Sequence, residues 1–183
     1  MDKSDNFERL HAPWRMEYIE RAGKPACACI FCEKPQQDSD GANLIVHRGA
    51  HCFVILNAFP YNNGHVMVIP YQHTADFTCL PPETLQELMR LTQLTILALR
   101  SAMRPDGFNV GMNIGSAAGA GIAEHLHLHI VPRWSGDTNF MPVVGHTRVL
   151  PESLARTWEK VRAAFNTVLQ QEGGAQNNAE GCQ

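Results

Sequence analysis

Three histidines at strict every-other spacing are the residues of this sequence best placed to do chemistry. His125, His127 and His129 alternate with leucines, and an Ile-Val-Pro run follows them. Successive side chains of a β-strand point to opposite faces, so the three imidazoles would share one face while the leucines enter a core. Neighbouring imidazoles that can become cationic near neutral pH repel one another unless a ligand uses them. The pattern therefore indicates a functional site on a strand.

A glycine-rich loop leads directly into this strand. The segment from Gly111 to Gly121 contains four glycines together with Asn113 and Ser116. Glycine lets backbone N–H groups approach a ligand closely, and clustered N–H groups bind anions. Loop and strand together predict a phosphate-binding cradle beside a row of imidazoles.

An imidazole next to a phosphorus atom can attack it and form a phosphoramidate, which water or another acceptor then resolves. The flanking imidazoles can orient the nucleophile and carry protons. One alternative is a catalytic zinc held by all three histidines, although such sites normally include carboxylates and Glu124 should point to the opposite face. A second alternative is a nucleotide-binding sensor whose histidines bind without catalysing a reaction.

The segment from His125 to Val131 matches the signature of the histidine triad superfamily, His-x-His-x-His followed by two apolar residues. Residues 64–70 with His73 resemble the second conserved block of that family, and residues 110–115 resemble the third. The resemblance spans about residues 27–134. It implies an α+β enzyme that hydrolyses or transfers nucleotidyl groups, works without a catalytic cofactor and usually forms a homodimer.

The resemblance also implies a role for individual residues. His127 would be the nucleophile on the α-phosphorus, with His129 and His65 forming the hydrogen-bond network around it. Asn57 stands where many members have an aspartate near the ribose, and Asn113 stands where an amide contacts phosphate. Asparagine can still hydrogen-bond a ribose hydroxyl, without a charge.

The sequence departs from the common family pattern just before the histidines. Most members have Gly-Gln-Ser/Thr there, whereas this loop is one residue longer and reads Ala-Gly-Ala-Gly-Ile at 118–122. This departure resembles a bacterial branch that includes a diadenosine tetraphosphate phosphorylase, which uses phosphate as the acceptor. Ser116, Gly119, Gly121 and Arg133 are the residues we expect to bind phosphate. We therefore favour phosphorolysis of diadenosine tetraphosphate to ADP and ATP, with hydrolysis of dinucleoside polyphosphates or nucleoside phosphoramidates as the alternative.

Cysteines are concentrated near the N-terminus, three of the six between residues 27 and 32. In many bacterial members of the family a structural zinc is held at four positions that match Cys29, Cys32, His73 and His125. Cys27 could replace the first of these ligands and His51 could replace the third. The alternative is a pair of buried free thiols without a metal.

The elements that must position these residues follow from apolar periodicity and turn signals. We predict strands at 44–48, 52–57, 65–69 and 108–114 and through the histidines, a loop at 33–42, a helix from Pro81-Pro82 to about Met103, and a last helix from Pro151 to near Leu169. The expected fold is α+β, with a mainly antiparallel sheet of about five strands, a long helix on one face and a C-terminal helix. The expected organisation is an N-terminal arm (1–24), the histidine triad domain (25–170) and a disordered tail (171–183).

Composition sets the outer bounds. The 183 residues are 44% hydrophobic and 18% charged with a net charge of -3, as expected for one ordinary globular domain. The charge argues against a nucleic-acid partner, and no apolar run is long enough to cross a membrane. The polar N-terminus shows no export signal, so we expect a cytoplasmic protein whose clustered cysteines bind metal and do not form disulfides.

Overall fold

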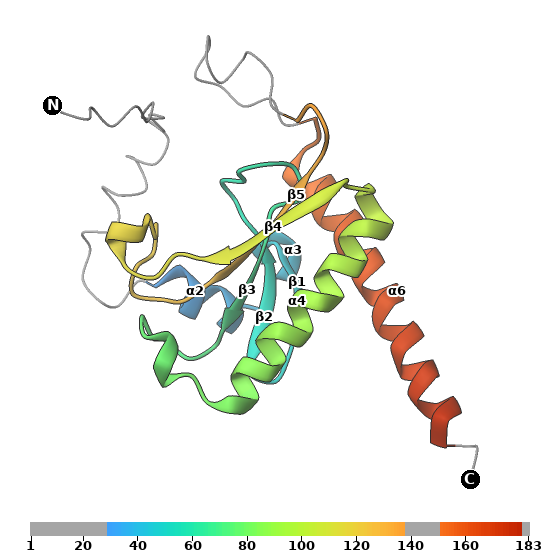
Figure 1. Cartoon of the computed structure of the whole chain (residues 1–183), viewed down its shortest axis with the longest axis horizontal. Helices are drawn as coiled ribbons and strands as arrows, with labels where there is room; N and C mark the ends of the chain where they lie inside the picture. Colours follow the sequence, from blue (N-terminus) through green and yellow to red (C-terminus); the bar gives the residue numbers. More distant parts are fainter. Residues whose placement is uncertain (1–28, 138–150, 181–183) are drawn as a thin grey trace, which may run out of the picture.

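The computed structural model describes residues 29–137 and 151–180, with side chains to residue 172. Five strands form one antiparallel sheet in the order β1-β2-β3-β5-β4 (Figure 1). The strands are β1 (Ile45–Arg48), β2 (Cys52–Leu56), β3 (Val66–Pro70), β4 (Gly107–Met112) and β5 (Leu128–Arg133). The α+β fold with a five-stranded antiparallel sheet is confirmed. The predicted N-terminal arm and Cys27 lie outside the described residues.

Two long helices cover one face of the sheet (Figure 1). Helix α4 (Pro82–Met103) begins with proline at its first position, where no backbone N–H is needed, and buries leucines at three- and four-residue spacing. Helix α6 (Leu154–Glu180) packs against α4 and β1 and contributes Val161 and Phe165 to the main core. This core fixes the sheet, and the histidine site lies on the sheet's other face.

A smaller apolar cluster occupies that other face. Because side chains alternate along β2, Val54 and Leu56 enter the main core while Phe53 and Ile55 enter the smaller cluster. Its remaining buried members are Phe31, Ile45, Met67 and Ile69. The central strands are consequently buried on both sides, and the smaller cluster forms the floor of the site described below.

We predicted a loop at 33–42, but the structure has short helical turns there. The short helical turns of this region are α2 (Ile30–Glu33), the 3₁₀ turn η1 (Lys34–Gln36) and α3 (Asp40–Asn43). A further 3₁₀ turn, η2 (Phe77–Cys79), lies before α4. Elements of three or four residues are too short for apolar periodicity to reveal them. The buried ring of Phe31 holds the first of these turns against the sheet.

The histidine strand begins later than we predicted, at Leu128, so that His125 and His127 lie in the segment before it. The ladder pairs Val68 with Leu128, and its continuation would place Pro70 opposite residue 126. Proline has no N–H to donate, which ends the ladder there. Residue 126 instead donates its backbone N–H to the carbonyl of Thr74 at 2.9 Å.

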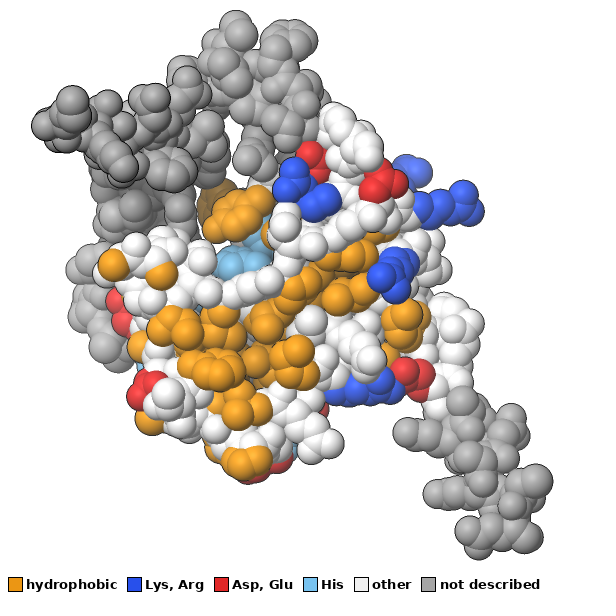
Figure 2. Space-filling model, viewed as in Figure 1, with side chains coloured by type: hydrophobic (Ala, Val, Ile, Leu, Met, Phe, Trp, Pro, Cys, Tyr) orange, Lys and Arg blue, Asp and Glu red, His pale blue; other side chains and the backbone are white. Residues whose placement is uncertain are grey.

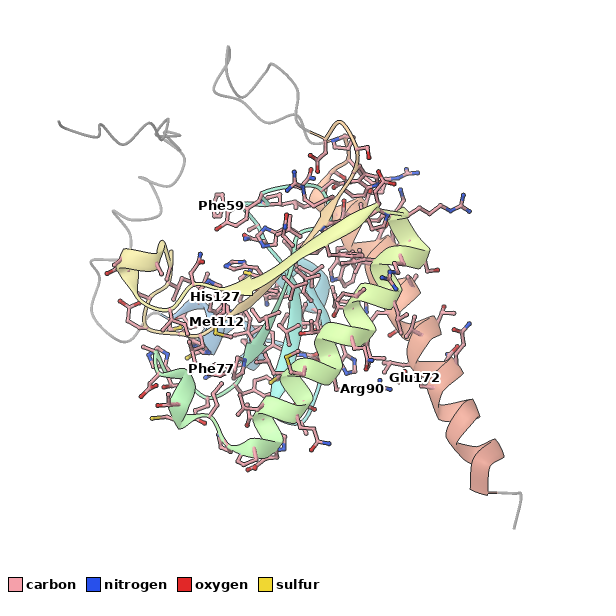
Figure 3. The ribbon with its side chains drawn as sticks, in the orientation of Figure 1. Phe59, Phe77, Arg90, Met112, His127 and Glu172 are labelled. Atoms are coloured by element: carbon pink, nitrogen blue, oxygen red, sulfur yellow. The ribbon has the colours of Figure 1, made fainter. Side chains whose placement is uncertain are left out.

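The C-terminal helix is longer than we predicted. We expected it to end near Leu169 and the chain to be disordered from residue 171, whereas α6 continues to Glu180. Residues 170–172 are Gln-Gln-Glu, which are good helix formers, and Glu172 forms an ion pair with Arg90 of α4 (Figure 3). Among the described residues, no helix is both long and apolar enough to cross a membrane.

Candidate active site and metal site

A backbone carbonyl two residues earlier sets the tautomer of His127, the nucleophile predicted from the sequence. His127 is 4% exposed, and its Nδ1 lies 2.8 Å from the carbonyl oxygen of His125. A carbonyl oxygen can only accept, so Nδ1 carries the proton and Nε2 keeps its lone pair. Burial lowers the pKa of His127, which favours this neutral form.

The imidazoles of His65 and His129 hydrogen-bond each other, and the tautomer of His65 is the opposite of that of His127. The backbone N–H of Tyr61 donates to Nδ1 of His65 at 3.1 Å, so the proton of His65 is on Nε2. That Nε2 lies 2.9 Å from Nδ1 of His129, to which it donates. Nδ1 of His129 is therefore an acceptor, and its Nε2 carries the proton. Burial, together with the neighbouring imidazoles of His129 and His127, lowers the pKa of His65 to about 3.

His127 and His129 thus present different groups side by side. Their ring centroids are 4.7 Å apart, with the ring planes at 81°. His127 offers a lone pair on Nε2, and His129 offers an N–H on Nε2. A lone pair beside an N–H donor is an arrangement that can attack a phosphorus and hydrogen-bond the oxygen of the leaving group.

Both imidazoles line a pocket with a largely apolar wall, over the smaller cluster of the sheet. In Figure 2 histidine surface is visible in a hollow of the molecule, and in Figure 3 His127 and Phe59 lie on the side away from α6. The lining residues come from the α2 segment, the end of β2 and the loop before the histidines: Ile30, Phe31, Lys34, Ile55, Leu56, Asn57, Ala58, Phe59, Tyr61, Met67, Gly121, Ile122, His127 and His129. Apolar walls with a few convergent polar groups are typical of small-molecule sites.

Two of the predicted substrate-binding residues, Asn57 and Gly121, line this pocket. The amide oxygen of Asn57 accepts the backbone N–H of Phe59 at 2.9 Å, and its Nδ2 lies 3.3 Å from Nδ1 of His65. The residue therefore connects the pocket to the histidine network. An amide oxygen has a second lone pair, which can accept from a ribose hydroxyl.

The other loop residues predicted to bind substrate shape the loop and are not among the pocket-lining residues. Nδ2 of Asn113 lies 3.5 Å from the carbonyl oxygen of Gly119 and closes the loop. Ser116 is exposed at the start of a 3₁₀ turn, η3 (Ser116–Ala118), and Gly119 ends that turn with a φ of 86°. A positive φ favours glycine at this position.

Arg133 is also not placed at the pocket. Its Nε donates to Asp137 at 2.6 Å, and its two terminal nitrogens donate to Asp137 and Asn109. Arg133 lies four residues beyond His129, which is about 13 Å along an extended strand. The fork geometry of the guanidinium suits the carboxylate of Asp137, and this pairing keeps Arg133 at the far end of β5.

Four predicted metal ligands converge next to the active site. The ligand atoms of Cys29, Cys32, His73 and His125 all lie within 4.8 Å of one another. His51, the alternative ligand, is exposed on the turn between β1 and β2 and is not a member of this cluster.

The cluster has the dimensions of a tetrahedral zinc site. With Zn–N near 2.05 Å and Zn–S near 2.3 Å, tetrahedral ligands lie about 3.3 Å apart for two nitrogens and about 3.5 Å for nitrogen and sulfur. Nδ1 of His73 and Nδ1 of His125 are 3.2 Å apart. Nδ1 of His125 is 3.3 Å from Sγ of Cys29 and 3.6 Å from Sγ of Cys32. The four residues therefore fit a zinc ion.

The surroundings of the cluster prepare it for a cation. Nε2 of His125 donates to the carbonyl of Pro70 at 2.8 Å, so the lone pair of Nδ1 faces the cysteines. Zinc-binding histidines commonly donate their other ring N–H to a carbonyl in this way. Burial, with a smaller contribution from Cys29, raises the pKa of the Cys32 thiol to about 11. A cation would reverse this effect and hold both sulfurs as thiolates.

The metal cluster and the active site share one element. Helix α2 lies between Cys29 and Lys34, and its Phe31 packs against the rings of His127 and His125, with centroid distances of 5.3 and 5.6 Å. His125 supplies a metal-facing Nδ1 and also the carbonyl that holds His127. Phe31 and His125 therefore link the metal cluster to His127.

Comparison with known proteins places this fold and site in one family. The HIT domain model matches residues 40–136, and the chain belongs to the histidine triad (HIT) family. A protein named AP-4-A phosphorylase from Mycobacterium tuberculosis (strain ATCC 25618 / H37Rv) is 42% identical over 160 residues, 84% of this chain and 82% of the relative.

Two solved structures of histidine triad proteins have a similar fold. A zinc-bound histidine triad family protein from Mycobacterium smegmatis has a TM-score of 0.65 and 28% identity, covering 80% of this chain and 99% of that chain. A hypothetical histidine triad nucleotide-binding protein from Sulfolobus tokodaii has a TM-score of 0.62 and 28% identity, covering 76% of this chain and 93% of that chain.

Proposed function

We propose that this protein is a nucleotidyl transferase that works through a covalent nucleotidyl-histidine at His127. The observation that carries the proposal is the bond from Nδ1 of His127 to the carbonyl of His125, which leaves Nε2 as the lone pair in the pocket. Nε2 would attack the α-phosphorus and form a P–N bond, while the P–O bond to the leaving group breaks. His129 would donate a hydrogen bond from its Nε2–H to the departing oxygen and stabilise the charge that develops there, with His65 holding the ring in place.

For the acceptor in the second step we favour inorganic phosphate. A phosphate oxygen would attack the nucleotidyl-histidine, break the P–N bond and release a nucleoside diphosphate. The relative from M. tuberculosis that carries the name AP-4-A phosphorylase supports this choice, as does the lengthened loop without the usual Gln and Ser/Thr side chains. Since Arg133 is held by Asp137, the donors nearest to such a phosphate would be backbone amides around Gly121 and the N–H of His129.

Product analysis with diadenosine tetraphosphate tests this proposal. In phosphate buffer we expect equal amounts of ADP and ATP, at a rate that rises with phosphate concentration. AMP plus ATP, formed at the same rate in phosphate-free buffer, would show that the acceptor is water and would overturn the hypothesis of a phosphorylase. His127→Gly is the control, because it removes the proposed nucleophile.

A metallohydrolase that uses all three triad histidines receives less support from the same contacts. Nδ1 of His127 is bound to a carbonyl and Nδ1 of His129 accepts from His65, whereas His125 faces the cysteines. The metal we propose is therefore structural. Chelation that leaves the protein folded should leave the nucleotidyl-histidine chemistry intact.

The same proposal includes the setting of the reaction. The substrate would be an adenine dinucleoside polyphosphate, the acceptor phosphate, and the assembly a homodimer. A cytoplasmic location remains a prediction from the sequence. A nucleotide-binding sensor would bind mononucleotides and form no product from any nucleoside phosphate, which the product analysis also reveals.

A further inference from the structure

One cation stands out in the described lining of the pocket. Lys34 is half-buried and lies in η1, directly after the helical turn that carries Ile30 and Phe31. Its position relative to the histidines suggests what it contacts.

Lys34 lies at the opposite end of the pocket from the nucleophile. The strand register places Ile45, Ile55, Met67 and His129 in one row across β1, β2, β3 and β5. Adjacent strands are about 4.8 Å apart, so this row is about 14 Å long. Nζ of Lys34 donates to the carbonyl of Asn43 at 3.2 Å, two residues before the β1 end of the row.

We propose that Lys34 contacts the edge of the nucleobase and makes the pocket accept guanine. This inference rests on the proposed function, because it takes the ligand to be a nucleotide with its α-phosphorus at His127. A nucleotide extends from its phosphate through the ribose to the base, so a phosphate at the histidine end directs the base toward Lys34. The wall between the two ends is apolar, including Ile55 and Met67, and suits the flat face of a base.

The choice of base follows from the donors of an ammonium group. Lysine has three N–H donors and no acceptor, and the bond to Asn43 uses one donor. Guanine presents two adjacent acceptors, O6 and N7, whereas adenine presents N7 beside an amino group that itself donates. Lys34 therefore pairs with guanine better than with adenine. The predicted substrate class widens from adenine to guanine-containing dinucleoside polyphosphates.

Binding of GMP and AMP to the full chain, measured by calorimetry, tests the inference. Lys34→Met keeps the apolar stem and removes the donors, and should weaken GMP binding about tenfold while AMP changes less than about twofold. Lys34→Arg keeps the charge and should retain most of the GMP affinity. Lys160→Met, on α6 where Lys160 pairs with Glu152, is the matched control and should leave both affinities unchanged.

Two results would overturn the inference. Equal weakening of GMP and AMP, with a lower melting temperature, would assign Lys34 a structural role through Asn43. Unchanged binding of both nucleotides would remove Lys34 from the recognition site. The proposed function fails separately, if wild-type protein binds nucleotides yet forms no adduct on His127 by mass spectrometry.

Discussion

At the scale of single residues, backbone hydrogen bonds determine which nitrogen of each imidazole in the candidate active site carries the proton. A carbonyl fixes Nδ1–H on His127, and a backbone N–H fixes the opposite tautomer on His65. Neither choice depends on another titrating side chain. The site can therefore keep the lone pair of a neutral His127 beside the N–H of His129 at the pH where both imidazoles in water would be partly charged.

Removing the nucleophile should abolish turnover while the fold remains intact. His127→Gly deletes the attacking Nε2, and we expect turnover of diadenosine tetraphosphate to fall by at least about 10³-fold. Steady-state kinetics measure this loss, and mass spectrometry should detect no nucleotidyl adduct. Retention of more than a few per cent of wild-type turnover would contradict the role of His127.

Stability should decrease in mild acid because of His65. Its folded pKa of about 3 lies below the ordinary histidine value of about 6.5, so between these two values the unfolded chain binds a proton that the folded protein excludes. The free energy of unfolding should therefore fall as pH falls from about 6.5 toward 3, by up to about 1.4 kcal/mol per pH unit. The groups that face this ring are His129, His127, Tyr61 and Asn57.

Urea denaturation at pH 6.5, 5.5 and 4.5 measures the decrease. His65→Gln has no titrating group at this position, so its unfolding free energy should depend on pH less steeply than that of the wild type. Parallel curves for the two proteins would show that His65 is not the source.

Residue types and spacing, with the family resemblance that they carry, predicted two sets of side chains that the structure brings together. These are His127 beside His129 with its partner His65, and the four candidate metal ligands. Residue types and spacing also placed Arg133 at the phosphate, although Asp137 takes its guanidinium four residues later. They gave no indication of Lys34 or Tyr61. Tyr61 acts through a backbone N–H, which no side-chain pattern reveals.

At the scale of elements, helix α2 contributes side chains both to the metal cluster and to the wall of the pocket. It is one helical turn long, has one buried residue and has no side-chain cap. Such a turn is not stable alone and needs tertiary contacts to hold it. The cluster of Cys29, Cys32, His73 and His125 supplies those contacts on one side, and the ring of Phe31 supplies them on the other.

Loss of the metal ligand set should therefore destabilise the protein and weaken nucleotide binding. For Cys32→Ser we expect a melting temperature more than about 5 °C lower, since a structural metal contributes several kcal/mol and a chain of this size loses about 2–4 °C per kcal/mol. Nucleotide affinity should also fall, because α2 forms part of the pocket wall.

Cys79→Ser is the matched control. Cys79 is exposed and hydrogen-bonds Asp76 at 3.2 Å, a bond that serine can also make. It should melt at the wild-type temperature. Metal analysis of wild-type protein should give close to one zinc per chain, and a metal-free sample with an unchanged melting temperature would exclude a structural zinc.

The strands and the long helix were predictable within one or two residues because their apolar patterns extend over several repeats. The short turns between residues 30 and 43 were not, and neither was the late start of β5. The start of β5 depends on Pro70 of β3, because a longer β5 would require residue 126 to pair with this proline. Strand length in a sheet is a property of two segments, and the sequence of one of them does not determine it.

At the scale of the whole molecule, the sheet has an edge that the described chain leaves uncovered. The strand order places β4 at one end, with its outer backbone groups facing away from β5. Large apolar side chains are exposed on β4, just after it and on α4: Val110 at 45%, Ile114 at 52%, Leu97 at 40% and Met89 at 59%. Figure 2 shows hydrophobic side chains gathered in a band over α4 and β4.

An apolar band beside a free strand edge is typical of a protein–protein interface. The homodimer that we propose would bury this band against the same band of a second copy, and β4 could pair with the β4 of that copy. A two-fold axis requires such a self-complementary surface. The histidine pocket lies on the other face of the sheet, so dimerisation would leave it open.

A charge in the middle of the band should therefore separate the dimer without damaging the fold. Val110→Glu would place a carboxylate in the interface, and burying it unpaired would cost several kcal/mol. We expect wild-type protein to sediment as a dimer and Val110→Glu as a monomer with an unchanged circular dichroism spectrum. Asn166→Glu, on the exposed face of α6, adds the same charge elsewhere and should stay dimeric. A wild-type chain that sediments as a monomer at micromolar concentration would reject the dimer, and a dimer that survives in Val110→Glu would move the interface away from β4.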